Sequence, residues 1–223
     1  MTFSLAARCA RTGMLGVAVS SSSPAVAARC AHARAGVGAV LSQNVTDPAL
    51  GPRALDLMER GATAAEAVAI IGRTPHAAYR QVVVVDAEGG AAVHSGPNAL
   101  GTWAEAVGKG VASGGNLLAH AGVPAAIVAA FEASTGHLGD RLLAALRAGL
   151  EAGGEAGPVH SAGMTVVDRM AWPLADLRCD WTEDCPITAV EAAWAVYRPQ
   201  MGAYVQRALD PAAAPSYGVP GDA

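Results

Sequence analysis

Gln81-Val82-Val83-Val84-Val85-Asp86, followed by Gly89-Gly90 and then Ala91-Ala92-Val93-His94-Ser95, says more about the fold than any other part of the chain. Four consecutive valines between polar ends are typical of a strand buried on both faces. The glycine pair supplies a turn into a second apolar run. The stretch therefore predicts a hairpin in an antiparallel sheet that is covered on both sides.

Further strand-like segments lie in blocks on either side of this hairpin. Residues 3–7 and 14–19 predict an N-terminal hairpin that turns at Gly13, with Thr2 roughly opposite Val19 and Ser20. The second strand of this hairpin is expected to end in the Ser20–Pro24 run. The remaining predicted strands cover 36–41, 107–113 (ending at Gly114-Gly115-Asn116), 162–168 and 174–180.

Helices are predicted between these blocks. One runs through Leu55 and Met58 to a stop at Gly61, and Thr63 with Glu66 forms a capping box for the next. Three more are expected at 124–134, at 138–152 and at 188–209, the last interrupted near Pro199.

The order of these elements predicts the fold class. Strands come in blocks instead of alternating with helices, which argues against a doubly wound parallel sheet. Two antiparallel sheets stacked between helix layers, a four-layer αββα sandwich of the α+β class, fit both the blocks and the fully apolar strands. We expect one domain over 1–210 and a flexible, Pro/Ala/Gly-rich tail over 211–223.

Composition narrows the class of protein further. The 223 residues are 52% hydrophobic with a formal net charge of −4, which does not suit a nucleic-acid-binding protein. The longest uncharged stretch, 110–131, holds several glycines and a proline, so no membrane span is expected. No signal peptide is visible, which predicts a cytoplasmic protein with four free cysteines, the alternative being a disulfide between Cys179 and Cys185. The alanine-rich apolar faces predict a homo-oligomer.

Motif searches predict neither a metal nor a cofactor. The six histidines lack metal-ligand spacing, and Gly36-Val37-Gly38 lacks the third glycine of a dinucleotide fingerprint. The acidic segment 176–184 is interpreted as a solvated loop.

Thr2 is the one position that stands out chemically. Removal of Met1 would make it the N-terminal residue, with a hydroxyl nucleophile and an α-amine in the same residue. An α-amine titrates near pH 8, so part of it is an unprotonated base at neutral pH. It can take the hydroxyl proton directly or through one water and so activate the nucleophile.

Several segments together resemble one family. They are Met1-Thr2-Phe3-Ser4, Gly16–Ser21, Arg34–Val40, Ser42-Gln43, Asn44–Pro48 with Gly51-Pro52, Arg80-Gln81-Val82 with Val85-Asp86, Gly96 with Trp103, and Gly115–Leu118. From residue 1 to about 168 the chain is similar to the bacterial DUF1028 family, which is grouped with the N-terminal nucleophile (Ntn) hydrolases. The resemblance implies an αββα sandwich and an amidohydrolase ancestry with Thr2 at the nucleophile position. It supplies no substrate.

The chain departs from the family pattern at two places. Gly114-Gly115-Asn116 stands where a Gln-Gly-Asn segment is expected. The run 155–162 (Glu-Ala-Gly-Pro-Val-His-Ser-Ala) stands where Asp-x-Arg-Gly-x-Gln-Ser-Ala is expected. An arginine and two glutamines that could orient a substrate are therefore missing. Lys109, the only lysine, falls outside the region where a proteasome-like lysine partner is expected.

Four further residues are candidates for a site around Thr2. The predicted hairpin places Ser20 beside Thr2, and Gln43 could reach the same end of the sheet. Asn116 could donate to a developing oxyanion. Arg8, on the same side of its strand as Thr2, could bind a carboxylate through two hydrogen bonds.

Three functions remain open from the sequence. The first is an amide-bond hydrolase that acts on a small, carboxylate-bearing amide through Thr2. The second is a small-molecule-binding or scaffold protein that kept the fold and lost catalysis. The third, the weakest, is a cysteine hydrolase that uses Cys9 or Cys30 with His32, because Cys30 and His32 would share a face of a strand.

Overall fold

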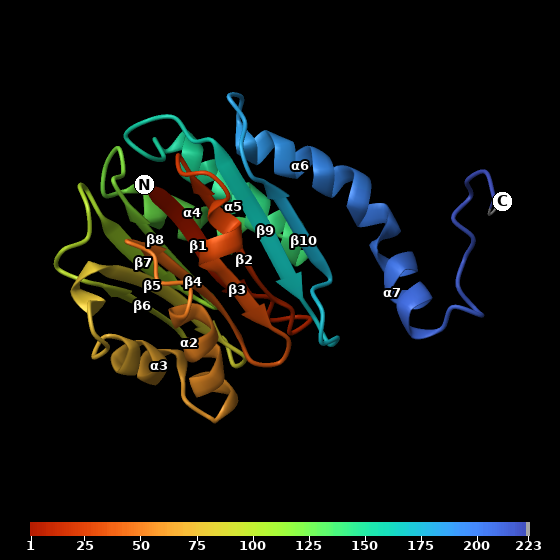
Figure 1. Ribbon diagram of the computed structural model, residues 1–223, viewed down its shortest axis with the longest axis horizontal. Helices are drawn as coiled ribbons and strands as arrows, with labels where there is room; N and C mark the ends of the chain where they lie inside the picture. The colour runs from red at the N-terminus through yellow and green to blue at the C-terminus, as the bar shows by residue number, and fades with distance from the viewer. Residues whose placement is uncertain (222–223) are drawn as a thin grey trace.

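The computed structural model describes residues 1–221 and is a mixed α+β structure with two antiparallel sheets (Figure 1). The six-stranded sheet has the order β10-β9-β2-β1-β8-β7, and the four-stranded sheet has the order β3-β4-β5-β6. The strands are β1 (Thr2–Arg8), β2 (Leu15–Ser21), β3 (Ala31–Arg34), β4 (Gly38–Asn44), β5 (Arg80–Asp86), β6 (Ala91–Ser95), β7 (Ala104–Gly108), β8 (Val111–Asn116), β9 (Ser161–Val167) and β10 (Ala175–Cys179).

The helices lie mostly between the strand blocks. They are α1 (Val26–Cys30), α2 (Leu50–Glu59), α3 (Ala64–Ile71), α4 (Val123–Ala133), α5 (Leu138–Glu151), α6 (Pro186–Tyr197) and α7 (Met201–Leu209), with 3-10 turns at Ala77–Tyr79 and Arg198–Gln200. The predicted capping box is present, since the Thr63 side chain accepts from the Glu66 N–H and the Glu66 carboxylate accepts from the Thr63 N–H. The predicted break at Pro199 is also confirmed, because the second 3-10 turn separates α6 from α7.

Three apolar clusters hold these elements together. The cluster between the sheets includes Val17 and Val19 of β2, Leu41 of β4, and Val83 and Val85 of β5. A second cluster packs α4, α5 and α6 on the other face of the six-stranded sheet, and a third packs α2 and α3 on the four-stranded sheet. Central strands such as β2 are therefore buried along their whole length, which explains their unbroken apolar sequence.

The N-terminal hairpin forms as predicted, but its register differs by one residue. Phe3 pairs with Ser20 and Ser4 with Val19, so Thr2 faces Ser21 and not Val19 or Ser20. The turn at Gly13 has φ of 79° and is closed by a hydrogen bond from the Cys9 N–H to the Met14 carbonyl. Because side chains alternate along a strand, this one-residue difference decides which serine shares a face with Thr2.

The single strand predicted over 107–113 is wrong. Two strands, β7 and β8, meet at a turn where Gly110 has φ of 68°. The pair Gly114-Gly115 continues β8 instead of ending it. Both positions are glycine because a Cβ there would collide with neighbouring side chains. It would lie 3.0 Å from the Val83 side chain at Gly114 and 2.6 Å from the Leu118 side chain at Gly115. These glycines therefore serve close packing within a buried strand.

The prediction of one strand over 36–41 is incomplete. The chain crosses from one sheet to the other through α1, enters β3, and only then forms β4. The crossing starts at Ala25, which has φ of 51° and whose N–H donates to the Asp180 carbonyl. Contacts with a segment more than 150 residues away in the sequence hold this short helix, so the local sequence carries no signal for it.

The C-terminal segment extends away from the sheets (Figure 1). None of the residues of α7 is buried. The predicted tail begins just after this helix, and its last two residues, 222–223, lie outside the described part of the chain. Within residues 1–221 no helix is both long and apolar enough to span a membrane.

Candidate functional site

Thr2 lies at the start of β1, a central strand of the six-stranded sheet. On one side it pairs with Asn116 of β8. On the other side lies β2, where the next residue of β1, Phe3, pairs with Ser20. Directly paired residues project to the same face, so Thr2 and Asn116 both face the layer between the sheets. The Thr2 side chain is buried, while Met1 before it is 37% exposed.

Two hydroxyl groups converge on the carbonyl of Met1. Thr2 Oγ1 and Ser21 Oγ each donate a hydrogen bond to that oxygen. The two hydroxyl oxygens are 3.4 Å apart, and Ser21 Oγ also accepts from the Ser23 N–H at 3.0 Å. The last peptide bond before Thr2 is therefore held against the hydroxyl of Thr2 itself.

A separate buried chain of hydrogen bonds starts at Ser4, two residues after Thr2 on the same face of β1, and crosses to the second sheet. Ser4 Oγ donates to Gln43 Oε1 at 2.6 Å, and Gln43 Nε2 donates to Gln81 Oε1 at 2.8 Å. Gln81 Nε2 in turn donates to Ser95 Oγ at 2.9 Å and to the Gly115 carbonyl at 3.2 Å. Both glutamines are fully buried, and these bonds satisfy most of their polar atoms.

Asn116 is less well satisfied than the glutamines. Its Nδ2 makes one long hydrogen bond, 3.4 Å to Gln81 Oε1, and its buried Oδ1 has no partner within residues 1–221. The next residue, Leu117, has φ of 51°, a conformation that costs energy for a non-glycine residue. A free acceptor and a strained backbone thus lie directly beside Thr2.

Glu155 brings a buried carboxylate to the same end of the sheet. Its side chain is 4% exposed, and both its oxygens accept from the Ser22 N–H, at 3.1 and 3.2 Å. An isolated bridge to Leu118 and a hydrogen bond from the Ala156 N–H to the Leu117 carbonyl hold its backbone beside the end of β8. Burial raises the pKa of Glu155 to about 7, against smaller lowering effects of Ser22, the N-terminal amine and His160.

His160 acts on this carboxylate and is itself held by Thr182 and Trp181. The His160 N–H donates to the Ser21 carbonyl, and its Nδ1 is 2.8 Å from the Thr182 carbonyl, which fixes the proton on Nδ1. The imidazole stacks on Trp181 with 4.5 Å between ring centroids. Of the acidic segment that was expected to be a solvated loop, residues 176–179 instead belong to β10, while the residues after the strand form a largely exposed loop in which Trp181 is 52% exposed.

The structure brings together only some of the predicted site residues. Asn116 is directly beside Thr2, and Gln43 reaches the same region through Ser4. Ser20 is not part of this site: it shares the face of Phe3, toward α4 and α5, and its Oγ donates to the Ser161 carbonyl at 3.1 Å. Ser21 takes the position expected for Ser20.

Arg8 is also separated from Thr2, because it ends β1 where Thr2 begins it. The extended strand is seven residues long, so the two residues lie about 20 Å apart along it. Arg8 is next to the turns at Gly89 and Gly110 instead. Lys109 lies at that same turn, so neither basic residue reaches the end of the sheet where Thr2 lies.

The cysteine alternative loses its geometric basis. Cys30 ends α1 while His32 belongs to β3, so they do not share a strand face. Cys30 contacts Thr46 Oγ1 at 3.6 Å, and burial raises the pKa of its thiol. The His32 ring packs against Gly51 and its Nε2 has no partner within residues 1–221. The structure therefore does not support a cysteine hydrolase of this kind.

Ser21, Ser4, Gln81 and Glu155 are the residues of this region that sequence reasoning did not select as candidates. A correct hairpin register would have found Ser21, and the alternation of polar residues at strand ends would have found Ser4 and Gln81. Glu155 follows a helix and belongs to no strand, so only the tertiary structure brings it to Thr2. Within residues 1–221 no three His, Cys, Asp or Glu side chains are placed to hold a metal ion.

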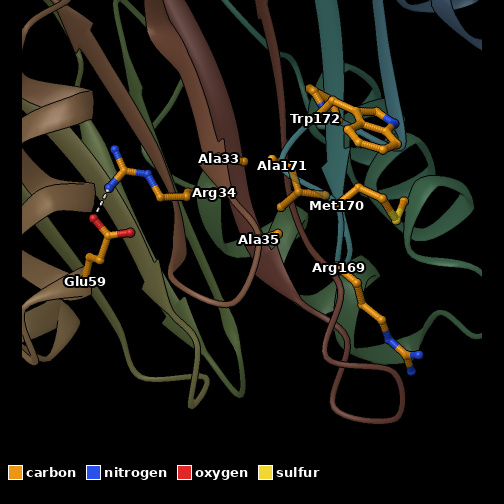
Figure 2. Close-up of a pocket in the computed structure, with 10 residues that line it drawn as sticks. Ala33, Arg34, Ala35, Glu59, Arg169, Met170, Ala171 and Trp172 are labelled. Atoms are coloured by element: carbon orange, nitrogen blue, oxygen red, sulfur yellow. Dashed lines mark hydrogen bonds and ion pairs between the residues drawn. The ribbon is translucent and has the colours of Figure 1, made fainter. Parts of the chain in front are cut away.

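A cavity of about 480 Å³ lies at the other end of the strands. Val167 on its wall pairs with Leu15, which pairs with Arg8, so the cavity is at the Arg8 end of the sheet. Figure 2 shows Arg34 turned toward Glu59 and Arg169 extending away from the other labelled side chains. Arg34 is neutralised by Asp56 at 2.9 Å and Glu59 at 2.8 Å, so this cavity offers no free charge from that residue.

Comparison with known proteins identifies the family. The model of the family of unknown function DUF1028 matches residues 2–190. The chain belongs to the DUF1028 family. The crystal structure of the DUF1028 protein SPO2555 from Silicibacter pomeroyi is similar to it, with a TM-score of 0.81, 29% sequence identity and coverage of 88% of each chain.

A second solved structure, Anbu (ancestral beta-subunit) from Yersinia bercovieri, aligns with 13% identity over 91% of this chain and 97% of that one. Its TM-score of 0.38 is too low to indicate a shared fold. No match was found among curated proteins.

Proposed function

We propose that this DUF1028 protein is an amide-bond hydrolase in which Thr2 becomes the nucleophile after removal of Met1, on a four-layer αββα sandwich of the Ntn type. The observation that carries the proposal is the placement of Thr2. Its hydroxyl is buried at the start of a central strand, beside Asn116 and Ser21. One apolar cluster fills the space between the sheets and two others pack helices on their outer faces, which supports the sandwich.

In the proposed reaction the α-amine of Thr2 takes the proton of its own hydroxyl, directly or through a water. Oγ1 then attacks the substrate carbonyl carbon, and the oxygen of that carbonyl becomes an oxyanion. The oxyanion lies where the Met1 carbonyl oxygen lies in the unprocessed chain, within reach of Ser21 Oγ. The second N–H of Asn116 Nδ2 is a further donor beside Thr2.

Collapse of the tetrahedral intermediate breaks the C–N bond, and the amine leaves with the proton that the Thr2 amine took up. Water then attacks the acyl ester on Oγ1 and restores the hydroxyl. The buried Ser4–Gln43–Gln81 chain supports this role because it holds β1 and β8 in register against the second sheet.

The proposal is tested by the mature N-terminus and by its reactivity. Intact mass of the protein from its native host is expected to show loss of Met1, and an alkyne-tagged β-lactone is expected to acylate Thr2. Thr2→Ala is expected to abolish labelling, whereas Thr2→Ser retains it. Ser20→Ala is the matched control, since Ser20 lies on the opposite face of the sheet. A retained Met1, or equal labelling of Thr2→Ala, contradicts the mechanism.

A second candidate is a catalytically inactive small-molecule-binding or scaffold protein with the same fold. One observation favours it: an arginine and two glutamines of the family pattern that could orient a substrate are missing from this chain. The same β-lactone experiment separates the two, because acylation of Thr2 in the processed protein excludes an inactive site.

A further inference from the structure

The Thr2 end of the sheet holds a buried acidic side chain. Glu155 is 4% exposed, and within residues 1–221 no arginine or lysine forms an ion pair with it. Arg8 and Lys109, which could have balanced it, lie at the other end of β1. A buried carboxylate without a cationic partner is costly, and a positive group that enters beside it relieves that cost.

Met1 shows what kind of group fits there. Its carbonyl oxygen is held by the hydroxyls of Thr2 and Ser21, and its Cε lies 3.8 Å from the position that a Cβ would take at Gly157, two residues after Glu155. Its α-amine forms no ion pair with Glu155 within residues 1–221, but its charge lowers the pKa of that carboxyl. Met1 is thus an aminoacyl group whose carbonyl lies against the nucleophile and whose side chain lies beside the segment that carries Glu155.

Asn116 adds a second acceptor on the opposite side of Thr2. Its Oδ1 is buried and has no partner within residues 1–221, although a buried amide oxygen normally accepts a hydrogen bond. A substrate that brings N–H groups satisfies this oxygen. A carboxylate would instead be repelled by Glu155.

We infer that the mature site selects an acyl group that carries a free α-ammonium, so that its substrates are amino acid amides or short peptides with an unblocked N-terminus. This inference rests on the proposed function and reverses one expectation from the sequence, that of a carboxylate-bearing amide. In the reaction the scissile C–N bond is the one between this aminoacyl group and its amine. Glu155 binds the ammonium and takes no part in the proton transfers.

Matched substrates test this selectivity in the processed enzyme. L-Alanine 4-nitroanilide, its N-acetyl derivative and its N-succinyl derivative share a leaving group and differ in charge at the α-nitrogen. At pH 7.5 we expect kcat/KM for the free amine to exceed that for the acetyl derivative by about tenfold or more, since a charge-assisted hydrogen bond is lost on acetylation. The succinyl derivative is expected to be the poorest. Equal values, or a preference for the succinyl derivative, overturn the inference.

Glu155→Gln is expected to lower the ratio of kcat/KM between the free-amine and acetyl substrates by about tenfold. Glu183→Gln is the matched control, because that carboxylate is 80% exposed and lies beside His160 without touching Thr2 or Glu155. It is expected to leave the ratio unchanged. A ratio that Glu155→Gln does not alter contradicts the assignment of the ammonium to Glu155.

A binding measurement separates failure of this inference from failure of the proposed function. The Thr2→Ala variant with Met1 removed has no nucleophile, and calorimetric titration of it with L-alaninamide and N-acetyl-L-alaninamide is expected to show about tenfold tighter binding of the former. If Thr2 is acylated by the β-lactone but the free amine has no advantage in either assay, the hydrolase stands and the ammonium site falls. If Thr2 is never acylated but the binding preference is present, the proposed chemistry falls and the ammonium site stands.

Discussion

The two ends of the layer between the sheets differ in where their polar side chains lie and in how these side chains are bonded. At the Thr2 end, Ser4, Gln43 and Gln81 are fully buried and bonded to one another across both sheets. At the Arg8 end, Ala33 and Ala35 face this layer, whereas the charged Arg34 between them turns to the α2 side and pairs near the surface with the exposed Asp56 and Glu59. Between the ends the layer is apolar, with Val83 and Val85 of β5 as examples.

This difference supports placing the proposed site at the Thr2 end. A polar chain between two sheets contributes less to stability than well-packed apolar side chains, because each group must be desolvated before it is bonded. Surface ion pairs such as those of Arg34 contribute little to stability and do not fix the geometry of neighbouring side chains. The buried chain at the Thr2 end fixes positions to within hydrogen-bond tolerance, as a catalytic site requires.

The largest effect is expected at Thr2 itself. In the processed enzyme Thr2→Ala should lower hydrolysis of L-alanine 4-nitroanilide by about 10³-fold or more, as loss of a hydroxyl nucleophile does in other hydrolases. Steady-state release of 4-nitroaniline measures it. A decrease of less than tenfold would place the chemistry elsewhere.

Removal of Gln81 should have the next largest effect. Gln81→Met keeps the size of the side chain but leaves Gln43 Nε2, Ser95 Oγ and the Gly115 carbonyl with fewer partners. We expect the free energy of unfolding to fall by about 3 kcal/mol, measured by urea denaturation. Val83→Thr, two residues along the same strand, adds an unpaired hydroxyl to the apolar part and is expected to cost about 1–3 kcal/mol. If Gln81→Met is neutral, the polar chain does not hold the sheets together.

Glu155 should make stability depend on pH. Its pKa is raised to about 7 by burial, so the folded protein holds a proton that the unfolded chain loses at lower pH. The stability contributed by the protonated form is therefore largely present near pH 5 and is lost as pH rises through about 7, by on the order of 2 kcal/mol. Urea denaturation at pH 5 and pH 8 measures the loss, and Glu155→Gln should reduce it. Since His160 and the N-terminal amine face Glu155, the difference between the two proteins is the informative quantity.

The smallest effect is expected at the Arg8 end. Arg34→Ala removes two exposed ion pairs and should change the free energy of unfolding by less than about 1 kcal/mol. It should leave acylation of Thr2 by the β-lactone unchanged. Loss of labelling in this variant would show that the cavity lined by Arg34 and Trp172 communicates with the N-terminus.

Much of the fold could be predicted from local sequence. The valine run of β5, the glycine turn after it and the Thr63–Glu66 cap are short-range signals, and all three are confirmed. The predictions failed where the same residue type occurs in two different structural settings. The pair Gly114-Gly115 is typical of a chain break, but here Gly114 allows the two sheets to pack closely and Gly115 makes room for the Leu118 side chain. Only the neighbouring Val83 and Leu118 distinguish these uses.

The site was predictable only in part, for a related reason. Chemistry alone pointed to Thr2, and Asn116 lies beside it. Ser20 was wrong because a one-residue difference in hairpin register exchanges the two faces of a strand, and the turn sequence did not fix that register. The prediction for Arg8 was wrong because two residues on the same side of a strand can still lie far apart along that strand.

The sequence by itself determined the family, the alternation of strand blocks with helices and the hydroxyl at position 2, because each depends on local patterns of a few residues. The tertiary structure decided the charge of the site. Glu155 is 153 residues from Thr2 in the chain and reaches it through the bridge to Leu118, while Arg8, six residues away, is carried to the far end of an extended strand. Sequence distance and spatial distance are reversed, because a strand separates near neighbours and sheet packing joins remote ones.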